Sequence, residues 1–412
     1  MRILLVAQET PAPPSLPGSP RVYHLLQSLR ARGHSVALVC GAHDAARWAE
    51  FLRQGGGNAR ALYPVRAAPQ LRFAGRVRNL VSPLPAFHMR YRAPAYFQIM
   101  RAEVARALAE FLPDVLHVDQ LAMAQYIPDA WRGAWVLDPH DAISLTETRK
   151  LTLDSSRTPR RMLARALMRY QILKIKNYER ANAQRADAYV VNAEPDRAYL
   201  ETFLPRAKLR AIPNAVDTGH FHPAREMEPK PQLVFTGSFS YAFNVDAMLY
   251  FHAHILPRVR AQFPALRLVI VGAHPPPAVQ RLAARDALTT VTGLVDDVRP
   301  FVWESAVFIS PLRGGTGMKN KLLNAMAMAK AIVATPASAE GLGARDGEHL
   351  LVAQDDAAFA EHIARVLNDR ALAQRLGDAG RAFVEQCYSV TKFGAQFEQL
   401  YGDVLRARRA DE

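Results

Sequence analysis

A glycine-rich turn followed by two lysines is the segment of the chain with the clearest chemical potential. Gly314, Gly315 and Gly317 run directly into a helix-forming stretch that opens with Lys319 and Lys321. Backbone amides at a helix N-terminus, together with the positive end of the helix dipole, attract anions such as phosphate. Two ammonium groups at the same end add to this attraction. The segment therefore predicts a site for a phosphate-bearing ligand, with a plain turn as the alternative.

Neighbouring residues offer further groups to the same ligand. Gly237 and Ser238 follow a run of apolar residues, so their amides and the serine hydroxyl could reach a phosphate; an ordinary turn after a strand is the alternative. Arg313 supplies a third cation beside the glycine-rich turn. Lys319 and Lys321 are two positions apart and cannot share one helix face. We assign Lys319 to the phosphates and keep Lys321 as a second candidate.

A polar cluster, Asp138, His140 and Asp141, follows another apolar run. Both carboxylates fall in one predicted loop, so they could not flank a sugar from opposite faces as a hydrolase pair must. Loop capping is the favoured role of Asp138 and Asp141, with a catalytic role as the alternative.

The framework that must position these groups is visible as short apolar runs alternating with helix-like segments. The expected strands cover residues 3–7, 35–40, 115–118, 135–138, 188–192, 233–236, 266–271, 307–310 and 331–334. Such runs between helices are typical of parallel sheets covered on both faces. Ligands of these sheets bind beyond the carboxyl ends of the strands. The sequence predicts an α/β fold with two doubly wound, Rossmann-like domains facing across a cleft.

The length of 412 residues and a hydrophobic share of 50% allow two cores rather than one. Residues 207–230, within a proline-rich stretch of mixed charge, are the expected linker. Residues 1–206 form the predicted first domain, completed by a crossover helix at 390–412. Residues 231–389 form the predicted second domain.

The cysteines and apolar runs bear on the compartment. Cys40 and Cys387 lie far apart without metal-like spacing, which favours a reduced, cytoplasmic protein with neither a disulfide framework nor a zinc site. The apolar run at the start is too short for a signal peptide. No uncharged stretch reaches the roughly 18 residues of a spanning helix. We expect no metal and no cofactor.

Positive charge is concentrated in the first half of the chain. Residues 1–200 hold 28 Lys and Arg against 16 Asp and Glu, whereas residues 201–412 hold 24 against 22. Residues 51–100 contain eight arginines and no acid. Arginines also recur every four positions, at 157, 161, 165 and 169. A solvated arginine-rich surface and peripheral attraction to an anionic membrane both remain open, but no motif supports a nucleic-acid partner.

Several motifs carry a family resemblance along nearly the whole chain. They are Arg32-Gly33-His34-Ser35-Val36, Asp138-Pro139-His140-Asp141, Pro213-Asn214-Ala215-Val216-Asp217, Val234 to Ala247, Val269-Ile270-Val271-Gly272, Val291 to Val298 and residues 314–343. In this order and at these spacings they resemble the retaining GT-B glycosyltransferases of the family 4 type. The subgroup with Gly-Thr-Gly-x-Lys-Asn-Lys before its long helix often serves bacterial exopolysaccharide or cell-surface assembly.

The resemblance implies an activity. A sugar would pass from a nucleotide-sugar donor to a hydroxyl of a glycan or lipid-linked glycan acceptor, with retention of anomeric configuration and without a metal. The leaving phosphate itself would receive the acceptor's proton. From the excess of Lys and Arg in residues 1–200 we further expect the acceptor on the basic first domain, with a lipid-linked glycan at the inner face of the plasma membrane as the hypothesis.

The resemblance also implies roles for single residues. His140 would contact the donor sugar, with a histidine bonded only within its loop as the alternative. Gly18 lies in the first loop, where family members bring amides near the diphosphate, although an acceptor role for that loop is equally open. Gly293 and Val295 would offer backbone contacts to the nucleobase. Glu340 would bond a ribose or sugar hydroxyl.

The chain departs from the family pattern at five positions. Thr316 and Asn324 stand where many members have glutamates, the second of which holds the ribose; Asn324 could keep the hydrogen bond without the charge. Ser238 replaces a frequent arginine, and Ala215 and Ala329 replace usual glycines. Donor affinity and activity are what these changes put in question. A nucleotide-sugar epimerase of GT-B fold and an inactive nucleotide-sugar-binding protein are therefore the alternatives.

Overall fold

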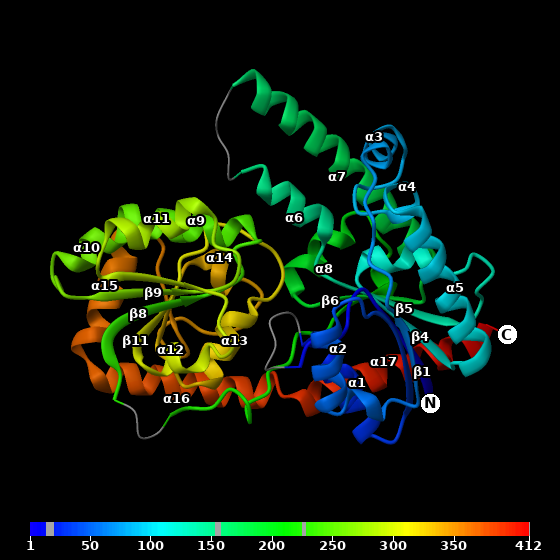
Figure 1. Ribbon diagram of the computed structural model, residues 1–412. Helices are drawn as coiled ribbons and strands as arrows, with labels where there is room; N and C mark the ends of the chain where they lie inside the picture. Colours follow the sequence, from blue (N-terminus) through cyan, green and yellow to red (C-terminus); the bar gives the residue numbers. More distant parts are fainter. Residues whose placement is uncertain (14–19, 153–157, 225–227, 412) are drawn as a thin grey trace. The chain divides into compact units, whose positions relative to one another are not determined.

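The computed structural model describes residues 1–13, 20–152, 158–224 and 228–411 (Figure 1). The chain divides into two compact units. The first contains Met1–Leu151, Ser156–Pro213 and Val390–Glu412, and the second contains Thr152–Ser155 and Asn214–Ser389. Part of the predicted linker, residues 209–211, forms a strand of the first unit, and the first long strand of the second unit begins at Lys230.

The first unit is built on a seven-stranded parallel sheet in the order β3-β2-β1-β4-β5-β6-β7. Its strands are β1 (Arg2–Ala7), β2 (Ser35–Gly41), β3 (Ala61–Val65), β4 (Val115–Asp119), β5 (Ala134–His140), β6 (Ala188–Val191) and β7 (Leu209–Ala211). The strand order reverses direction between β1 and β4. The central strands are buried along their lengths, as expected for apolar runs covered on both faces.

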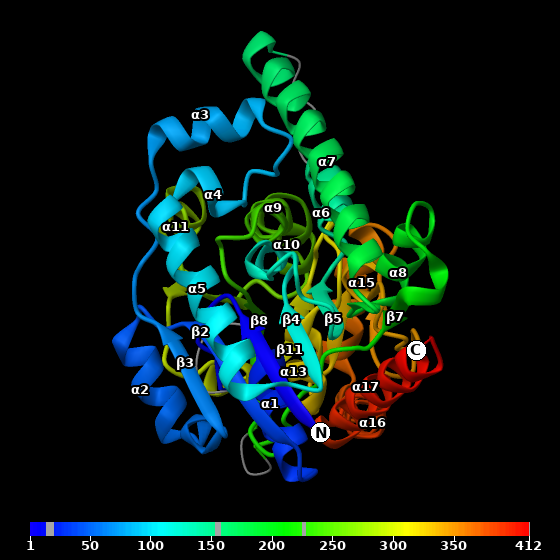
Figure 2. The ribbon, with the colours of Figure 1, turned by 90° about the vertical axis from the view of Figure 1, so that its right-hand side faces the viewer.

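Helices cover both faces of this sheet. They are α1 (Arg21–Ala31), α2 (Ala45–Arg53), α3 (Phe73–Val81), α4 (Met89–Arg92), α5 (Pro94–Phe111), α6 (Ile143–Lys150), α7 (Pro159–Arg185), α8 (Glu194–Glu201) and α17 (Val390–Asp411), with 3-10 turns at Gly56–Asn58, Leu121–Tyr126 and Arg206–Lys208. Helix α5 packs across β1, β2 and β3, which Figure 2 shows from the side. Asp44 begins α2 by accepting a hydrogen bond from the Arg47 amide.

Helix α17 belongs to the first unit although it follows the second in sequence. It packs against α1, where a Cβ on Gly394 would overlap the Ser28 side chain. Ser28 Oγ donates to the Val390 carbonyl at 3.2 Å, and Glu398 pairs with Arg32 at 2.8 Å. Because Gly394 has no side chain, α1 and α17 can approach each other closely.

The second unit is built on a six-stranded parallel sheet in the order β10-β9-β8-β11-β12-β13. Its strands are β8 (Lys230–Thr236), β9 (Arg267–Val271), β10 (Thr289–Gly293), β11 (Ser305–Ser310), β12 (Ile332–Ala334) and β13 (Leu351–Val352). Its helices are α9 (Ala242–Tyr250), which continues through a π-helical turn (Phe251–Ile255) into α10 (Leu256–Arg260), α11 (Pro277–Arg285), α12 (Arg299–Trp303), α13 (Asn320–Ala327), α14 (Pro336–Ala339), α15 (Asp356–Asn368) and α16 (Arg370–Cys387).

Side chains of successive strand residues pack into the two cores on opposite faces of this sheet. Leu233 and Phe235 of β8 enter one buried cluster, while Val234 between them enters the other. The prediction of two doubly wound parallel-sheet domains is confirmed. Among the described residues, no helix is both long and apolar enough to span a bilayer.

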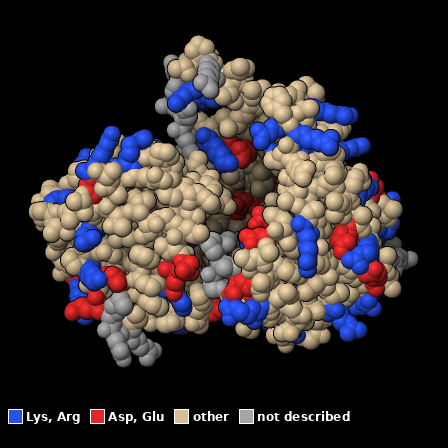
Figure 3. Space-filling view, viewed as in Figure 1, with Lys and Arg blue, Asp and Glu red and all other residues tan. Residues whose placement is uncertain are grey.

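The basic residues of the first unit are not spread evenly. Lys and Arg side chains gather over α3, α4 and α7 in the space-filling view (Figure 3). Helices α3 and α4 lie within residues 51–100, where the sequence carries eight arginines and no acid.

Candidate active site

The predicted phosphate-binding residues of the second unit meet at one point of its sheet. Strands β8 and β11 are neighbours, and the strand order departs from them in opposite directions. Gly237 and Ser238 follow the carboxyl end of β8, and the loop 311–319 follows the carboxyl end of β11. Open parallel sheets bind ligands in the crevice at such a reversal of strand order. The fold therefore brings the two groups of predicted residues together.

Lys321 of α13 is the cation closest to the end of β8. Its Nζ donates to Asn244 Oδ1 at 2.7 Å, and Asn244 Nδ2 donates to the Ser238 carbonyl at 2.6 Å. The same Nζ lies 4.0 Å from the centroid of the Phe235 ring. Burial, and secondarily the charge of Lys319, lower the pKa of Lys321 well below its usual value. An anion beside this ammonium group would favour its charged form.

Lys319 takes a different position from Lys321. It is buried at the start of α13, and its Nζ donates to the carbonyl oxygens of Gly317 at 2.7 Å and Thr316 at 3.1 Å. These bonds hold the glycine-rich loop in shape. Gly315 (φ +128°) and Gly317 (φ +62°) adopt backbone conformations that other residues rarely take. The two lysines thus have different roles. Lys319 holds the loop through hydrogen bonds, and Lys321 extends to the end of β8.

Gly237 contributes space rather than a free amide. Its amide donates to the Val271 carbonyl at 2.9 Å, so it is already used between β8 and β9. A Cβ at this position would lie 2.8 Å from Lys321 Nζ and 2.9 Å from Asn244 Nδ2. The hydroxyl of Ser238 accepts a long hydrogen bond of 3.4 Å from the Ser240 amide. Any larger residue at 237 would displace the lysine and asparagine side chains.

Arg313 is held by α9. Its guanidinium bonds both carboxylate oxygens of Asp246, at 2.9 and 2.5 Å, and stacks 4.1 Å from the centroid of the Tyr250 ring. Hydrogen bonding to Asp246 raises the pKa of Arg313. The side chain is 43% exposed, so it lies at the rim of the loop rather than within it.

The remaining predicted residues of the second unit lie on or after several different elements. Asn324 is half-buried on α13, and Glu340 follows α14. Gly293 ends β10 with a positive φ, and its carbonyl accepts from the Gly272 amide at 3.1 Å. Val295 packs half-buried against the core. Gly18 lies outside the described residues.

The sequence analysis missed two features of this site. Asn244 bridges Lys321 and Ser238, although only its place in the Phe-Asn-Val-Asp motif could have indicated it. A hydroxyl network also joins the ends of β11 and β12: Ser338 Oγ donates to the Ser310 carbonyl at 2.6 Å, and Thr335 Oγ1 donates to the Leu312 carbonyl at 2.5 Å. This network fixes the chain where it enters the glycine-rich loop.

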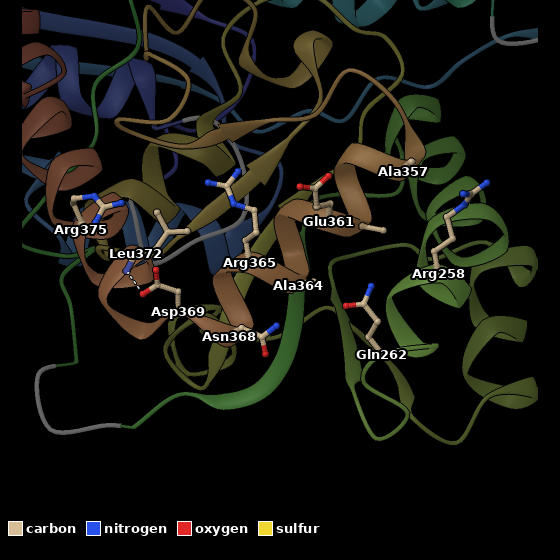
Figure 4. A pocket seen from close by; sticks show the side chains of 11 residues that line it. Arg258, Gln262, Ala357, Glu361, Ala364, Arg365, Asn368, Asp369, Leu372 and Arg375 are labelled. Atoms are coloured by element: carbon tan, nitrogen blue, oxygen red, sulfur yellow. Dashed lines mark hydrogen bonds between the residues drawn. The ribbon is translucent and has the colours of Figure 1, made fainter.

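A separate depression in the second unit has no residue in common with this site. It holds about 630 Å³ and is lined by helices α10, α15 and α16, with Arg258, Glu361, Arg365 and Arg375 among its side chains (Figure 4). Asp369, drawn bonded to the Leu372 amide, caps α16. Arginine and carboxylate side chains both line this depression.

In the first unit, His140 is the last residue of β5. Its Nε2 lies 2.5 Å from Oδ1 of Asp119, the last residue of β4. Burial works against the charged imidazole, but the carboxylate of Asp119 outweighs it, so the pKa of His140 is raised. Its φ of +74° is unusual for a residue with a side chain. Asp119 was not predicted, because only the pairing of β4 with β5 places it beside the histidine.

The prediction that Asp138 caps a loop is wrong. Asp138 lies within β5 and is fully buried, and its carboxylate bonds Arg21 of α1 at 2.8 and 3.2 Å. The Arg21 guanidinium also donates to the Ile212 carbonyl at 3.1 Å. Burial opposes the charge, but Arg21 keeps the pKa of Asp138 below its usual value. This pair is therefore part of the core, where a lone carboxylate would be costly.

Comparisons with known proteins agree with this architecture. Residues 19–220 match the model of Glycosyltransferase Family 4, and residues 230–369 match that of Glycosyl transferases group 1. An uncharacterized 44.6 kDa protein in the cps region of Klebsiella pneumoniae is 24% identical over 175 residues, which are 40% of this chain and 45% of that protein. A phosphatidyl-myo-inositol mannosyltransferase of Mycobacterium tuberculosis is 31% identical over 206 residues, 47% of this chain and 53% of that enzyme. The matches thus span about half the length of these relatives.

Solved structures match over almost the whole chain. Sucrose-phosphate synthase of Thermosynechococcus elongatus superposes with a TM-score of 0.74 at 16% identity, covering 99% of this chain and 100% of that one. Anabaena HepE in complex with UDP-glucose gives 0.64 at 12% identity, covering 98% and 100%. Identities this low establish the fold alone. Together with the matches of residues 19–220 and 230–369 to two glycosyltransferase models, they show that the chain has the GT-B fold.

Proposed function

We propose that the protein is a retaining glycosyltransferase that moves a sugar from a nucleotide-sugar donor to a glycan or lipid-linked glycan. The observation that carries this proposal is the meeting of Gly237, Ser238, Lys319 and Lys321 where β8 and β11 part. A cationic crevice of this kind suits the diphosphate of a nucleotide sugar. The relative in the Klebsiella cps region supports a role in bacterial surface or exopolysaccharide assembly.

The chemistry assigned to the second unit is stabilisation of the leaving group. When the bond from the sugar to the diphosphate breaks, negative charge grows on the departing phosphate oxygen. Preorganised cations and amides lower the energy of that state by several kcal/mol. Lys321 and the N-terminus of α13 supply them, while Lys319 keeps the loop in place. The acceptor hydroxyl attacks the sugar carbon and passes its proton to the departing phosphate.

His140 is assigned to the transferred sugar. Asp119 favours its charged form and fixes Nε2, which leaves Nδ1 as the ring nitrogen for a further contact. The other donor contacts proposed here remain those of the sequence analysis: Asn324 and Glu340 to hydroxyls, and Gly293 and Val295 to the base. The reaction is proposed to need neither a metal nor a cofactor.

The cytoplasmic face of the plasma membrane is the proposed location. The excess of Lys and Arg over Asp and Glu in residues 1–200 supports attraction to anionic lipid. The mannosyltransferase relative carries a lipid, phosphatidyl-myo-inositol, in its name. A lipid-linked acceptor is the corresponding proposal for this chain.

A nucleotide-sugar panel followed by product analysis tests the proposal. We expect thermal stabilisation by one nucleotide sugar, nucleotide release only when an acceptor is added, a product with the donor's anomeric configuration, and unchanged rates in EDTA. Inversion of configuration would refute retention, and loss of activity in EDTA would refute metal independence. A donor altered without acceptor would indicate the epimerase alternative.

One observation favours a second candidate, a nucleotide-sugar-binding protein without turnover. Asn324 and Thr316 stand where the resembling family has glutamates, and the Lys319 ammonium bonds carbonyls of its own loop. Calorimetry separates the two cases. Donor affinity with no nucleotide release in any acceptor mixture would establish the binding protein and overturn the enzyme.

A further inference from the structure

Two helices of the first unit expose apolar side chains that nothing in the described chain covers. Phe73, Val77 and Val81 of α3 are 79%, 52% and 77% exposed. Leu163 and Leu173 of α7 are 63% and 60% exposed. Soluble surfaces seldom gather large apolar side chains in this way without a partner. We refer to the exposed sides of α3 and of the first four turns of α7 as the α3–α7 face.

The exposure on α3 follows from how the helix packs. Its buried residues are Gly75 and Asn79, and a Cβ on Gly75 would overlap the backbone of α4 at Tyr91. Phe73, Val77 and Val81 recur every four residues on the opposite side of the helix. The helix is therefore amphipathic in the reverse sense: its small and polar residues face the protein, and its large apolar residues face outward.

Helix α7 continues the same surface. Leu163 and Leu167 are four residues apart on one side of the helix, and Arg161, Arg165 and Arg169 form a row on its opposite side. The Lys174 ammonium donates to the carbonyls of Asn79 at 2.7 Å and Leu80 at 2.9 Å, which ties α7 to the end of α3. Both helices extend from the same end of the first unit in both ribbon views (Figures 1 and 2).

The charge of the α3–α7 face identifies its partner. Residues 51–100 and 158–178 contain no acid, whereas Arg72, Arg76 and Arg78 lie on or beside α3. A second copy of the chain would oppose arginine to arginine. A nucleic acid would satisfy the arginines but leave the apolar side chains in water. Only a surface that is anionic outside and apolar just beneath satisfies both groups, and an anionic lipid bilayer is such a surface.

We propose that the α3–α7 face docks on an anionic lipid bilayer, with its apolar side chains entering the interface and its arginines pairing with headgroup phosphates. The proposal specifies the membrane contact of the proposed function and rests on that function for its purpose. The exposed apolar side chains are an observation independent of the net charge.

Vesicle flotation tests the proposal with the full chain. We expect strong recovery with phosphatidylcholine mixed with phosphatidylglycerol and weak recovery with phosphatidylcholine alone. Leu163→Ser with Leu167→Ser, and separately Phe73→Ser with Val77→Ser, should lower partitioning at least about tenfold. Arg72→Gln, Arg76→Gln and Arg78→Gln, which flank the apolar row of α3, should each lower it roughly fivefold. Ile99→Ser and Arg53→Gln, on exposed parts of α5 and α2, are the matched controls and should bind as the unaltered protein does.

Three results would overturn the proposal. One is equal recovery on neutral and anionic vesicles. Another is serine variants that partition like the unaltered chain. The third is sedimentation showing a dimer that dissociates in the serine variants while vesicle binding is absent. The arginine variants leave the apolar residues in place, so they test the face even if a serine variant unfolds, which circular dichroism reports.

The result can be separated from the proposed function because donor binding is measured without vesicles. If the chain binds a nucleotide sugar but does not float with vesicles, only the docking proposal is refuted. If the chain floats with vesicles but binds no donor and transfers no sugar, the proposed function is refuted.

Discussion

Lys321 sits in an unusual position for a lysine, because its ammonium group is held between an amide, an aromatic ring and the backbone at the end of a strand. Its ammonium group donates to the side-chain amide oxygen of Asn244. Burial lowers the pKa of this ammonium group well below its usual value. A diphosphate entering the site would raise that pKa, because a nearby anion favours the charged form of the amine.

Replacing Lys321 should therefore weaken nucleotide binding selectively. We expect Lys321→Met to cost about 1–3 kcal/mol in affinity for a nucleoside diphosphate, the usual loss of a charge-assisted hydrogen bond. Isothermal titration calorimetry measures the loss. Lys230→Met is the matched control, because Lys230 begins β8 and its side chain is exposed and paired with Glu304. Equal affinity in the Lys321 variant would remove the residue from the donor site.

The pair His140–Asp119 predicts a pH dependence. Asp119 raises the pKa of His140 above the usual 6.5, so the pair stabilises the fold fully below pH 6.5 and loses that contribution as the pH rises through the folded value. In an NMR titration, the His140 ring should titrate above 6.5, and Asp119→Asn should move its midpoint down. A midpoint that stays in place after this substitution would contradict the assignment.

Residue identities alone led to most of the phosphate site but not to its internal geometry. The glycines and lysines of residues 314–321 indicate an anion site because all of these residues lie close together in the sequence. The bond between Lys321 and Asn244 joins residues 77 positions apart, and the one between His140 and Asp119 depends on strand pairing. Contacts of this kind follow from topology, which no local pattern contains.

At the level of elements, strands with continuous apolar runs were predictable and short edge strands were not. The central strands β1, β2, β4, β5, β8, β9 and β11 lie where the sequence predicts strands. Strand β3 was missed because Pro64 interrupts it, which an edge strand tolerates. Strands β7 and β13 have three and two residues, too few for a periodic signal. Edge strands depend on their neighbours more than on their own sequence.

The contact between α1 and α17 gives a prediction at this scale. Gly394→Ala should destabilise the first unit by about 1–3 kcal/mol, because the new methyl group would overlap Ser28. Urea unfolding measures the effect. Gly402→Ala on the same helix is the control, since only the flexible Arg406 side chain lies nearby. Adding Ser28→Gly to Gly394→Ala should restore part of the loss, and additive costs would contradict the proposed overlap.

Across the whole molecule, the two units share one construction but differ in charge and in continuity. The second unit is a nearly continuous stretch of chain, whereas the first is closed by a helix from the far end. The ring centroids of Phe393 and Phe397 in that helix lie 5.2 and 5.3 Å from the Arg21 guanidinium carbon. The Tyr401 hydroxyl hydrogen-bonds to His117 Nδ1 at 2.9 Å. Burial lowers the pKa of His117 to about 4, so the His117 imidazole stays neutral beside the buried Arg21–Asp138 pair.

Removing α17 should therefore damage one unit and spare the other. We expect a chain ending at Ser389 to lose the cooperative unfolding transition of the first unit, because the side chains that cover Arg21 and His117 are gone. The transition of the second unit and its affinity for nucleoside diphosphate should persist. Calorimetry and limited proteolysis report both. Two intact transitions in the shortened chain would show that α17 is dispensable for the first unit.

The late position of α17 has a consequence for biosynthesis. The ribosome makes all seven strands of the first unit before any residue of the second sheet, yet the helix that finishes the first unit emerges only after the second is complete. The half that begins to form earliest is thus the one that matures last. Until α17 is made, the surface of the first unit that it will cover stays exposed, including Arg21 and His117. This surface is the part of the nascent polypeptide that a chaperone would have most reason to bind.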